Sequence, residues 1–149
     1  MEDNKTKYNN NTEELNLKAL IALSRCSQSV HKREYRTIKE GGLTVSQFAV
    51  LEVLYHKGDL RISEIIDKIL STGGNMTVVI DNLVKDGLVS RCSDPADKRV
   101  NLIRITEKGK DLIQGIFPNH KENINEIFSV LTEDEKRNLI NTLKKLSGV

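Results

Sequence analysis

The sequence has no tryptophan, only two cysteines, two prolines and three histidines, and no long apolar segment. Its longest run without a charged residue, Ile69–Ile80, has 12 residues, whereas a membrane-spanning helix needs roughly 20. Cys26 and Cys92 form neither a CxxC pair nor a zinc pattern, and two cysteines rarely indicate a disulfide framework. The first residues, MEDNKTKYNNNTEE, lack the apolar stretch of a signal peptide. We therefore expect a protein that is not secreted, not membrane-bound and not disulfide-rich.

Neither sign of charge dominates, because 23 Lys and Arg residues against 21 Asp and Glu residues leave a net charge of +2. A nucleic-acid-binding role would therefore depend on where the basic residues lie. His31, His56 and His120 are far apart in the sequence, so we expect no metal site and place these residues at the surface or at junctions. No nucleophile–base pair and no phosphate-binding loop is recognisable. The sequence predicts no enzyme and no cofactor.

The 149 residues are enough for one domain with a single core. Apolar residues make up 38% and charged residues 30% of the chain, which is polar for a monomer. The first long helix is predicted over about residues 13–40, with two adjoining apolar stripes at helical spacing. These stripes consist of Leu15, Ala19, Leu23, Cys26 and Val30, and of Leu17, Leu20 and Ile21. Two stripes indicate a helix that packs on two sides.

The middle of the chain changes from helical to extended periodicity. A capping box, Thr44–Gln47, opens a helix that ends at Gly58. The segments that follow are one strand rung at 60–62, helices over about 63–70 and 75–86, and two strands over 88–93 and 100–105. Residues 94–99 join the strands and form a protruding, charged tip. This order of elements is that of a winged helix-turn-helix.

Two further helices are predicted after the hairpin. Thr106 opens a long helix in which Pro118 should produce a kink or a break. A second capping box, Thr132–Glu135, starts the last helix. The expected fold class is mainly α with a small β-wing. A winged-helix lobe over about 44–106 lies between helices at 13–40 and 107–149 within one domain of residues 1–149.

The helix at 75–86 has an outward face suited to the major groove, because that face is small or polar. This face and the residues just before it comprise Gly73, Gly74, Asn75, Thr77, Val78, Asn82 and Lys85. The cations of the lobe gather near the wing, at Arg91, Lys98, Arg99 and Arg104. Asp81, also on the outer face, would be repelled by phosphate. Its carboxylate could instead accept a hydrogen bond from cytosine or pair with a nearby cation, and the sequence leaves both alternatives open.

Three segments in order resemble the MarR family (multiple antibiotic resistance regulators) of bacterial transcription factors. The most specific is LVKDGLVSRCSDPADKRVNLIRITEKGK, with Ile105 in a position that is usually Leu. LTVSQFAVLEVL and LTEDEKRNLINTLKKL match two further segments, and the resemblance covers about residues 13–147.

The resemblance implies a homodimer, and we expect a cytoplasmic repressor that binds a pseudo-palindromic duplex and responds to a small effector. The start of the helix at 75–86 is most similar to a branch in which some members respond to catechols and quinones, so the effector is expected to be phenolic. In this frame Arg99 enters the minor groove, Asp97 orients it, and Lys98 contacts phosphate. Arg91 either contacts phosphate or pairs with Asp94.

A ligand cleft is expected where the dimerisation helices meet the DNA-binding lobe. Its candidate lining residues are His31, Tyr35 and Phe48.

Two alternatives remain beside this hypothesis. Some relatives sense peroxides with a cysteine near the start of the first helix, which makes Cys26 a candidate redox site. The apolar stripe around Cys26 instead favours a small buried side chain. The near-balanced charge of the lobe is also compatible with a winged helix that binds only other proteins.

Overall fold

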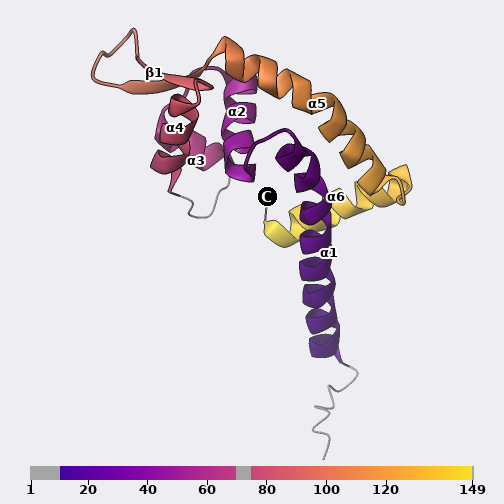
Figure 1. Cartoon of the computed structure of the whole chain (residues 1–149). Coiled ribbons are helices and arrows are strands. Elements are labelled where there is room, and N and C mark those ends of the chain that lie inside the picture. Colours follow the sequence, from indigo (N-terminus) through magenta and orange to yellow (C-terminus); the bar gives the residue numbers. More distant parts are fainter. Residues whose placement is uncertain (1–10, 70–74, 149) are drawn as a thin grey trace, which may run out of the picture. The chain divides into compact units, whose positions relative to one another are not determined.

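The computed structural model describes residues 11–69 and 75–148. This part of the chain forms six α-helices and one two-stranded sheet (Figure 1). The elements are α1 (Thr12–Glu40), α2 (Val45–Lys57), α3 (Ile62–Ile69), α4 (Met76–Lys85), β1 (Val89–Ser93), β2 (Asn101–Ile105), α5 (Glu107–Phe128) and α6 (Glu133–Ser147). The mainly α-helical class with a small β-wing is confirmed. The chain divides into two compact units between Arg33 and Glu34, within α1.

The described residues of the N-terminal unit belong almost entirely to α1, and its apolar side chains are exposed. The large ones are Leu15, Leu17, Leu20, Ile21 and Leu23, with exposed fractions between 40% and 67%. Cys26 is exposed as well. The expectation that Cys26 is buried is therefore wrong for the single chain, because no other described element belongs to this unit.

The second unit is built around one apolar core. Its buried side chains come from the end of α1, from α2, α3, α4 and both strands, and from the first half of α5. The side chains with at most 1% of their surface exposed are Ile38, Val50, Leu51, Leu54, Ile65, Ile80, Leu83, Ile103 and Ile113. Burial of these β-branched and leucine side chains supplies the main favourable term in folding the lobe.

The sheet is an antiparallel pair in which Val89 faces Ile105 and Ser93 faces Asn101. Leu60 adds an isolated bridge to Ile103, with N–H···O distances of 3.2 and 2.7 Å in the two directions. The predicted strand rung at 60–62 is thus confirmed as one bridging residue. It ties the segment between α2 and α3 to the base of the hairpin.

Side-chain caps fix the starts of α2, α5 and α6. Both predicted capping boxes form: the Thr44 hydroxyl accepts from the Gln47 N–H at 3.1 Å, and the Thr132 hydroxyl accepts from the Glu135 N–H at 3.2 Å. Hydrogen bonds from Thr132, the backbone N–H first, hold the pKa of Glu135 below its ordinary value. Thr106 caps α5 by accepting from the Gly109 N–H at 3.1 Å.

Of the kink and the break that the sequence allowed at Pro118, the break is wrong, since α5 is one continuous, curved helix (Figure 1). Pro118 is exposed, while Ile113, Ile116 and Ile127 form a buried stripe, of which Ile113 and Ile116 belong to the core of the second unit. His120, expected at the surface or at a junction, lies on that stripe and is only 7% exposed.

Two glycines in α5 provide a matched test of this packing. A Cβ at Gly109 would overlap the carbonyl oxygen of Leu88 and lie 2.8 Å from Ile105 Cγ1, whereas one at Gly115 would meet no described atom within 4 Å. We expect Gly109→Ala to lower the free energy of unfolding by about 1–3 kcal/mol, the usual cost of overpacking. Gly115→Ala should raise it by about 0.5–1 kcal/mol, because alanine favours helix. Urea denaturation measures both, and equal stability of the two variants would contradict the described contact between α5 and Leu88.

Candidate nucleic-acid interface

The outer face of α4 is open and carries small polar side chains. Met76, Ile80 and Leu83 point into the core, and this leaves Thr77, Val78 and Asn82 exposed. Asn75 precedes the helix as its N-cap residue and makes no side-chain capping bond, so its amide does not bond to the first turn. Of the residues predicted to face DNA in this region, Gly73 and Gly74 lie outside the described residues. The helix can present this face and its N-terminal amides to a duplex.

Aspartate side chains shape the tip of the wing. Asp94 accepts from the Ala96 N–H at 2.9 Å, and Val100 closes the loop by donating to the Asp97 carbonyl at 3.0 Å. The Asp97 carboxylate also accepts three bonds from Arg99: from its backbone N–H at 3.1 Å, from Nε at 3.1 Å and from Nη2 at 3.2 Å. The guanidinium is thus held in one orientation with 91% of the Arg99 side chain exposed. Lys98 is exposed beside it.

Hydrogen bonds from Arg99 also determine the pH range in which Asp97 and Arg99 form an ion pair. The guanidinium first, and the backbone N–H second, hold the pKa of Asp97 below its ordinary value. A carboxylate with a lowered pKa stays ionised until the pH falls below that value. The orientation of Arg99 by Asp97 is therefore present throughout the neutral range and is lost only in acid.

Arg91 is paired with a carboxylate that the sequence hypothesis did not choose. Its guanidinium bonds to Asp81 on α4, not to Asp94. Both side chains remain partly exposed, at 41% for Arg91 and 55% for Asp81. The open question about Asp81 is thereby answered for the free protein: its charge is matched by a cation of the neighbouring strand.

Comparison with known proteins decides the family. The family model described as MarR family matches residues 43–100. The HTH-type transcriptional regulator MhqR of Bacillus subtilis (strain 168) is 43% identical over 133 residues, which cover 89% of this chain and 92% of that protein. The chain belongs to the MarR family. It is therefore a transcriptional regulator of the helix-turn-helix type, a class of DNA-binding proteins and not of enzymes.

Solved structures show the same fold at lower identity. A putative MarR-like transcription regulator from Bacillus cereus ATCC 10987 superposes with a TM-score of 0.78 at 24% identity, over 90% of this chain and 97% of that one. Bordetella bronchiseptica BpsR, whose structure addresses the regulation of its DNA binding by 6-hydroxynicotinic acid, gives a TM-score of 0.75 at 24% identity. That match covers 95% of this chain and 96% of BpsR.

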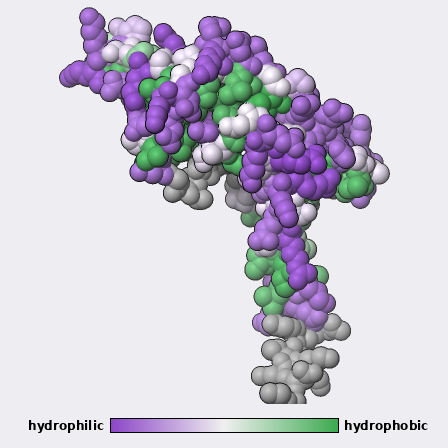
Figure 2. All heavy atoms as spheres, in the orientation of Figure 1, coloured by the Kyte–Doolittle hydropathy of each residue, from purple (hydrophilic) through white to green (hydrophobic). Residues whose placement is uncertain are grey.

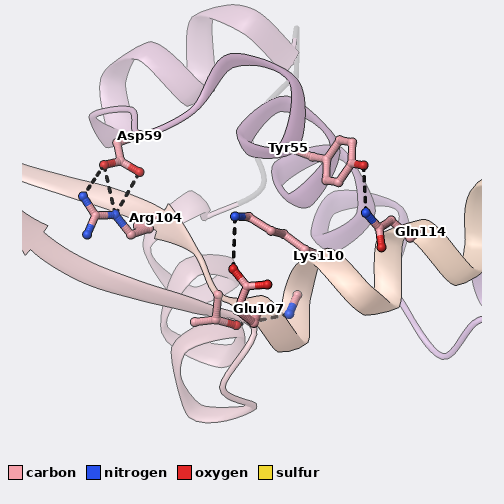
Figure 3. A network of polar contacts seen from close by, with 8 residues as sticks. Tyr55, Asp59, Arg104, Glu107, Lys110 and Gln114 are labelled. Atoms are coloured by element: carbon pink, nitrogen blue, oxygen red, sulfur yellow. Dashed lines mark hydrogen bonds and ion pairs between the residues drawn. The ribbon is translucent and has the colours of Figure 1, made fainter.

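Within the MarR fold of this chain, Arg104 serves the lobe itself. Its guanidinium donates three bonds to the Asp59 carboxylate, at 3.2, 3.0 and 2.6 Å (Figure 3). These bonds raise the pKa of Arg104 above its ordinary value. Figure 3 also shows Lys110 donating to Glu107 within α5 at 3.2 Å, and Gln114 of α5 donating to the Tyr55 hydroxyl of α2 at 3.1 Å, a contact that joins α5 to the lobe. Arg104, one of the four cations near the wing, is therefore bound to a carboxylate in the loop after α2.

The residues predicted to bind a ligand are distributed over both units. His31 belongs to the N-terminal unit, while Tyr35 and Phe48 belong to the second. Phe48 is 4% exposed, and its ring centroid lies 6.3 Å from that of Phe117 and 5.0 Å from that of His120. Tyr35 is half-buried against the core. Their role in ligand binding stays a prediction.

Sequence reasoning missed the buried polar residues of α5. His120 and Asn123 are 7% and 5% exposed. Their positions continue the spacing of Ile113, Ile116 and Ile127 at intervals of three and four residues, and this spacing was the signal that could have placed them inside. Within the described ranges, no helix is long and apolar enough to cross a membrane, and no three His, Cys, Asp or Glu side chains converge as metal ligands.

The Asp81–Arg91 pair leads to a prediction about DNA affinity. Arg91→Ala leaves an unmatched carboxylate on the outer face of α4, and we expect it to weaken binding to any duplex about fivefold. This corresponds to the roughly 1 kcal/mol that one charge exerts on another at about 4 Å in water. Asp81→Asn combined with Arg91→Ala should regain most of the loss. Fluorescence anisotropy with specific and scrambled duplexes measures it; a double variant as weak as Arg91→Ala would show instead that Arg91 itself contacts phosphate.

Proposed function

We propose that this MarR-family protein is a homodimeric, ligand-responsive repressor that acts in the cytoplasm on a pseudo-palindromic DNA site. The observation that carries the proposal is the exposed polar face of α4 together with an oriented arginine at the tip of the adjoining hairpin. A helix face and a protruding cation suit the two kinds of groove that one half-site offers, the major groove and the flanking minor groove.

Each predicted contact has a distinct role in this proposal. Asn75, Thr77, Val78 and Asn82 contact base edges or phosphates in the major groove, together with Gly74. Lys98 contacts phosphate, which contributes affinity without sequence preference. Arg99, aligned by Asp97, enters the minor groove, where narrow A·T-rich sequence strengthens the negative potential. Arg91 neutralises Asp81 so that α4 can approach the phosphates.

Dimerisation is supported by apolar surface that the single chain leaves exposed. On α6 this surface consists of Leu139, Ile140, Leu143 and Leu146, which are 38% to 71% exposed. The apolar residues of α1 form a second such surface, visible in green in Figure 2. Contiguous exposed apolar surface of this kind marks a protein–protein contact. A second copy of the chain would cover both helices.

The response to a ligand would act through the spacing of the two α4 helices. Half-sites read by a dimer lie about 34–36 Å apart, one turn of the duplex, so a change in the relation of the two lobes misaligns one of them. The regulation of BpsR by 6-hydroxynicotinic acid supports such a response in this fold. His31, Tyr35 and Phe48 remain the candidates from the sequence for the ligand cleft.

The test is a gel-shift experiment with the DNA upstream of the protein's own coding sequence. We expect a discrete complex that survives an excess of random duplex. A complex that random DNA removes completely would contradict sequence-specific repression and would favour the alternative of a winged helix that binds other proteins.

Cys26 is the candidate for a redox response, and its exposure on α1 is the observation in favour. An unmodified cysteine in an apolar stripe is nevertheless expected to serve packing in the dimer. Cys26→Ser should therefore leave DNA binding and release by inducer unchanged in a gel-shift titration. Oxidant-driven release that disappears in Cys26→Ser would establish the thiol-based sensor instead.

A further inference from the structure

Helix α4 exposes one large apolar side chain among polar ones. Val78, in the first turn of the helix, is 50% exposed. The other large apolar residues of this helix are buried or packed half-buried against the core: Met76, Val79, Ile80, Leu83 and Val84. Val78 belongs to neither of the apolar surfaces, on α1 and α6, that dimerisation would cover. Its side chain is therefore available to the DNA that α4 contacts in the proposed function.

Asn82 follows Val78 by four residues, which places both side chains on the same face of α4, about one turn apart. Asn82 is exposed, and its side-chain amide has no hydrogen-bond partner among the described residues. An amide offers a carbonyl oxygen as acceptor and an NH2 group as donor. Both groups of Asn82 are therefore available to a base edge in the major groove.

The other exposed side chains of α4 do not select one base in the same way. The Thr77 hydroxyl both donates and accepts, so it can bond to several bases. Asp81 is bonded to a cation of β1, and Lys85 lies in the last turn. Val78 and Asn82 each have one best complement in the major groove. An apolar side chain contacts the C5-methyl group of thymine, and asparagine forms two bonds with N6 and N7 of adenine.

We propose that α4 selects a half-site in which Val78 packs on the C5-methyl group of a thymine and the Asn82 amide forms two hydrogen bonds with an adenine. The two residues lie about 6 Å apart along the helix axis, at 1.5 Å per residue, and the bases of one strand are about 3.4 Å apart. The thymine and the adenine should therefore lie within about two base pairs of each other. This assignment rests on the proposed function and adds the identity of two bases.

The experiment uses the full-length protein and the duplex recovered by selection from a random pool, with both half-sites changed alike. Each thymine of the half-site is replaced in turn by deoxyuridine, which pairs in the same way and lacks only the C5-methyl group. Fluorescence anisotropy should find one position at which this replacement weakens binding about fourfold per half-site, the effect of burying one carbon group. Val78→Ala should bind the unmodified duplex more weakly and should show no further loss at that position.

The adenines are tested with 7-deazaadenine, in which a C–H group replaces N7 and base pairing is retained. One position, within about two base pairs of the thymine assigned to Val78, should lose about fivefold in affinity per half-site. This is the ratio that one hydrogen bond produces. Asn82→Ala should bind the unmodified duplex more weakly and should be insensitive to 7-deazaadenine at that position.

Controls separate these contacts from folding. Alanine favours helix more than valine or asparagine does, so Val78→Ala and Asn82→Ala should melt no lower than the unmodified protein. Val130→Ala makes the same change at an exposed valine between α5 and α6 and should keep the full effect of deoxyuridine. Base-analogue effects that persist undiminished in Val78→Ala or in Asn82→Ala would overturn the proposal and leave sequence-specific binding intact. A selection that enriches no sequence would contradict both this proposal and the proposed function.

Discussion

Aspartate in place of Leu143 is expected to abolish dimerisation at micromolar concentration and to weaken specific DNA binding by at least about a hundredfold. Leu143 is exposed in the single chain and lies among the apolar residues of α6. In a dimer the new carboxylate would be buried at a contact without a partner, which is costly enough to separate the subunits. A monomer reaches one half-site only, and the loss of a linked second site costs about 10²–10⁴ in affinity.

The matched control is Asn141→Asp, which introduces the same charge on α6 at an exposed position about half a turn away from Leu143. It should leave the association state and the DNA affinity unchanged. Sedimentation velocity measures the association state, and the unmodified protein should have twice the 16.8 kDa mass of one chain. A folded particle of 16.8 kDa for the unmodified protein would disprove the dimer.

Alanine in place of Arg99 should weaken specific binding by about 1–3 kcal/mol per half-site, the range for a well-placed base-edge contact. The loss should be greatest for sites with A·T-rich flanks, because the guanidinium responds to the potential of a narrow minor groove. Stability should change by less than about 0.5 kcal/mol, since Arg99 is exposed at a loop tip away from the core.

Variants at two neighbours of Arg99 distinguish a specific contact by Arg99 from a general effect of positive charge on DNA affinity. Lys98→Ala should weaken all duplexes alike and reduce the salt slope by roughly one unit per half-site. Asp97→Ala should resemble a milder Arg99→Ala, because it removes the carboxylate that aligns the guanidinium. Fluorescence anisotropy on specific and scrambled duplexes across salt concentrations measures all three variants. Arg99→Ala with the affinity of the unmodified protein would eliminate the minor-groove assignment.

Local sequence signals predicted the elements that position the interface. The capping boxes at Thr44 and Thr132 were recognisable because their partners lie three residues away. The hairpin was recognisable because its strands alternate around a turn rich in Asp and Pro. The alignment of Arg99 by Asp97 was predictable for the same reason, since the two residues are neighbours in one loop.

Contacts between distant segments could not be predicted in the same way. Arg104 and Asp59 are 45 positions apart, and nothing near either residue specifies the other. Arg91 had Asp94 close in sequence, yet it pairs with Asp81, because strand geometry places its side chain toward α4.

Burial also depended on context outside each helix. Cys26 lies in an apolar stripe and is exposed, because the described residues of its unit offer nothing to cover it. His120 is polar and is buried, because Thr37 satisfies its Nδ1 on the core side of α5. Hydrophobicity alone assigned both residues to the wrong environment.

Selection of binding sites from a pool of random duplexes tests the central claim most directly. A dimer that presents two α4 helices and two Arg99 wings should enrich a pseudo-palindrome. Its half-sites should lie about 10–10.5 base pairs apart from centre to centre, with A·T-rich sequence on both flanks. Enrichment of a single, non-repeated half-site, or of no sequence at all, would contradict the account.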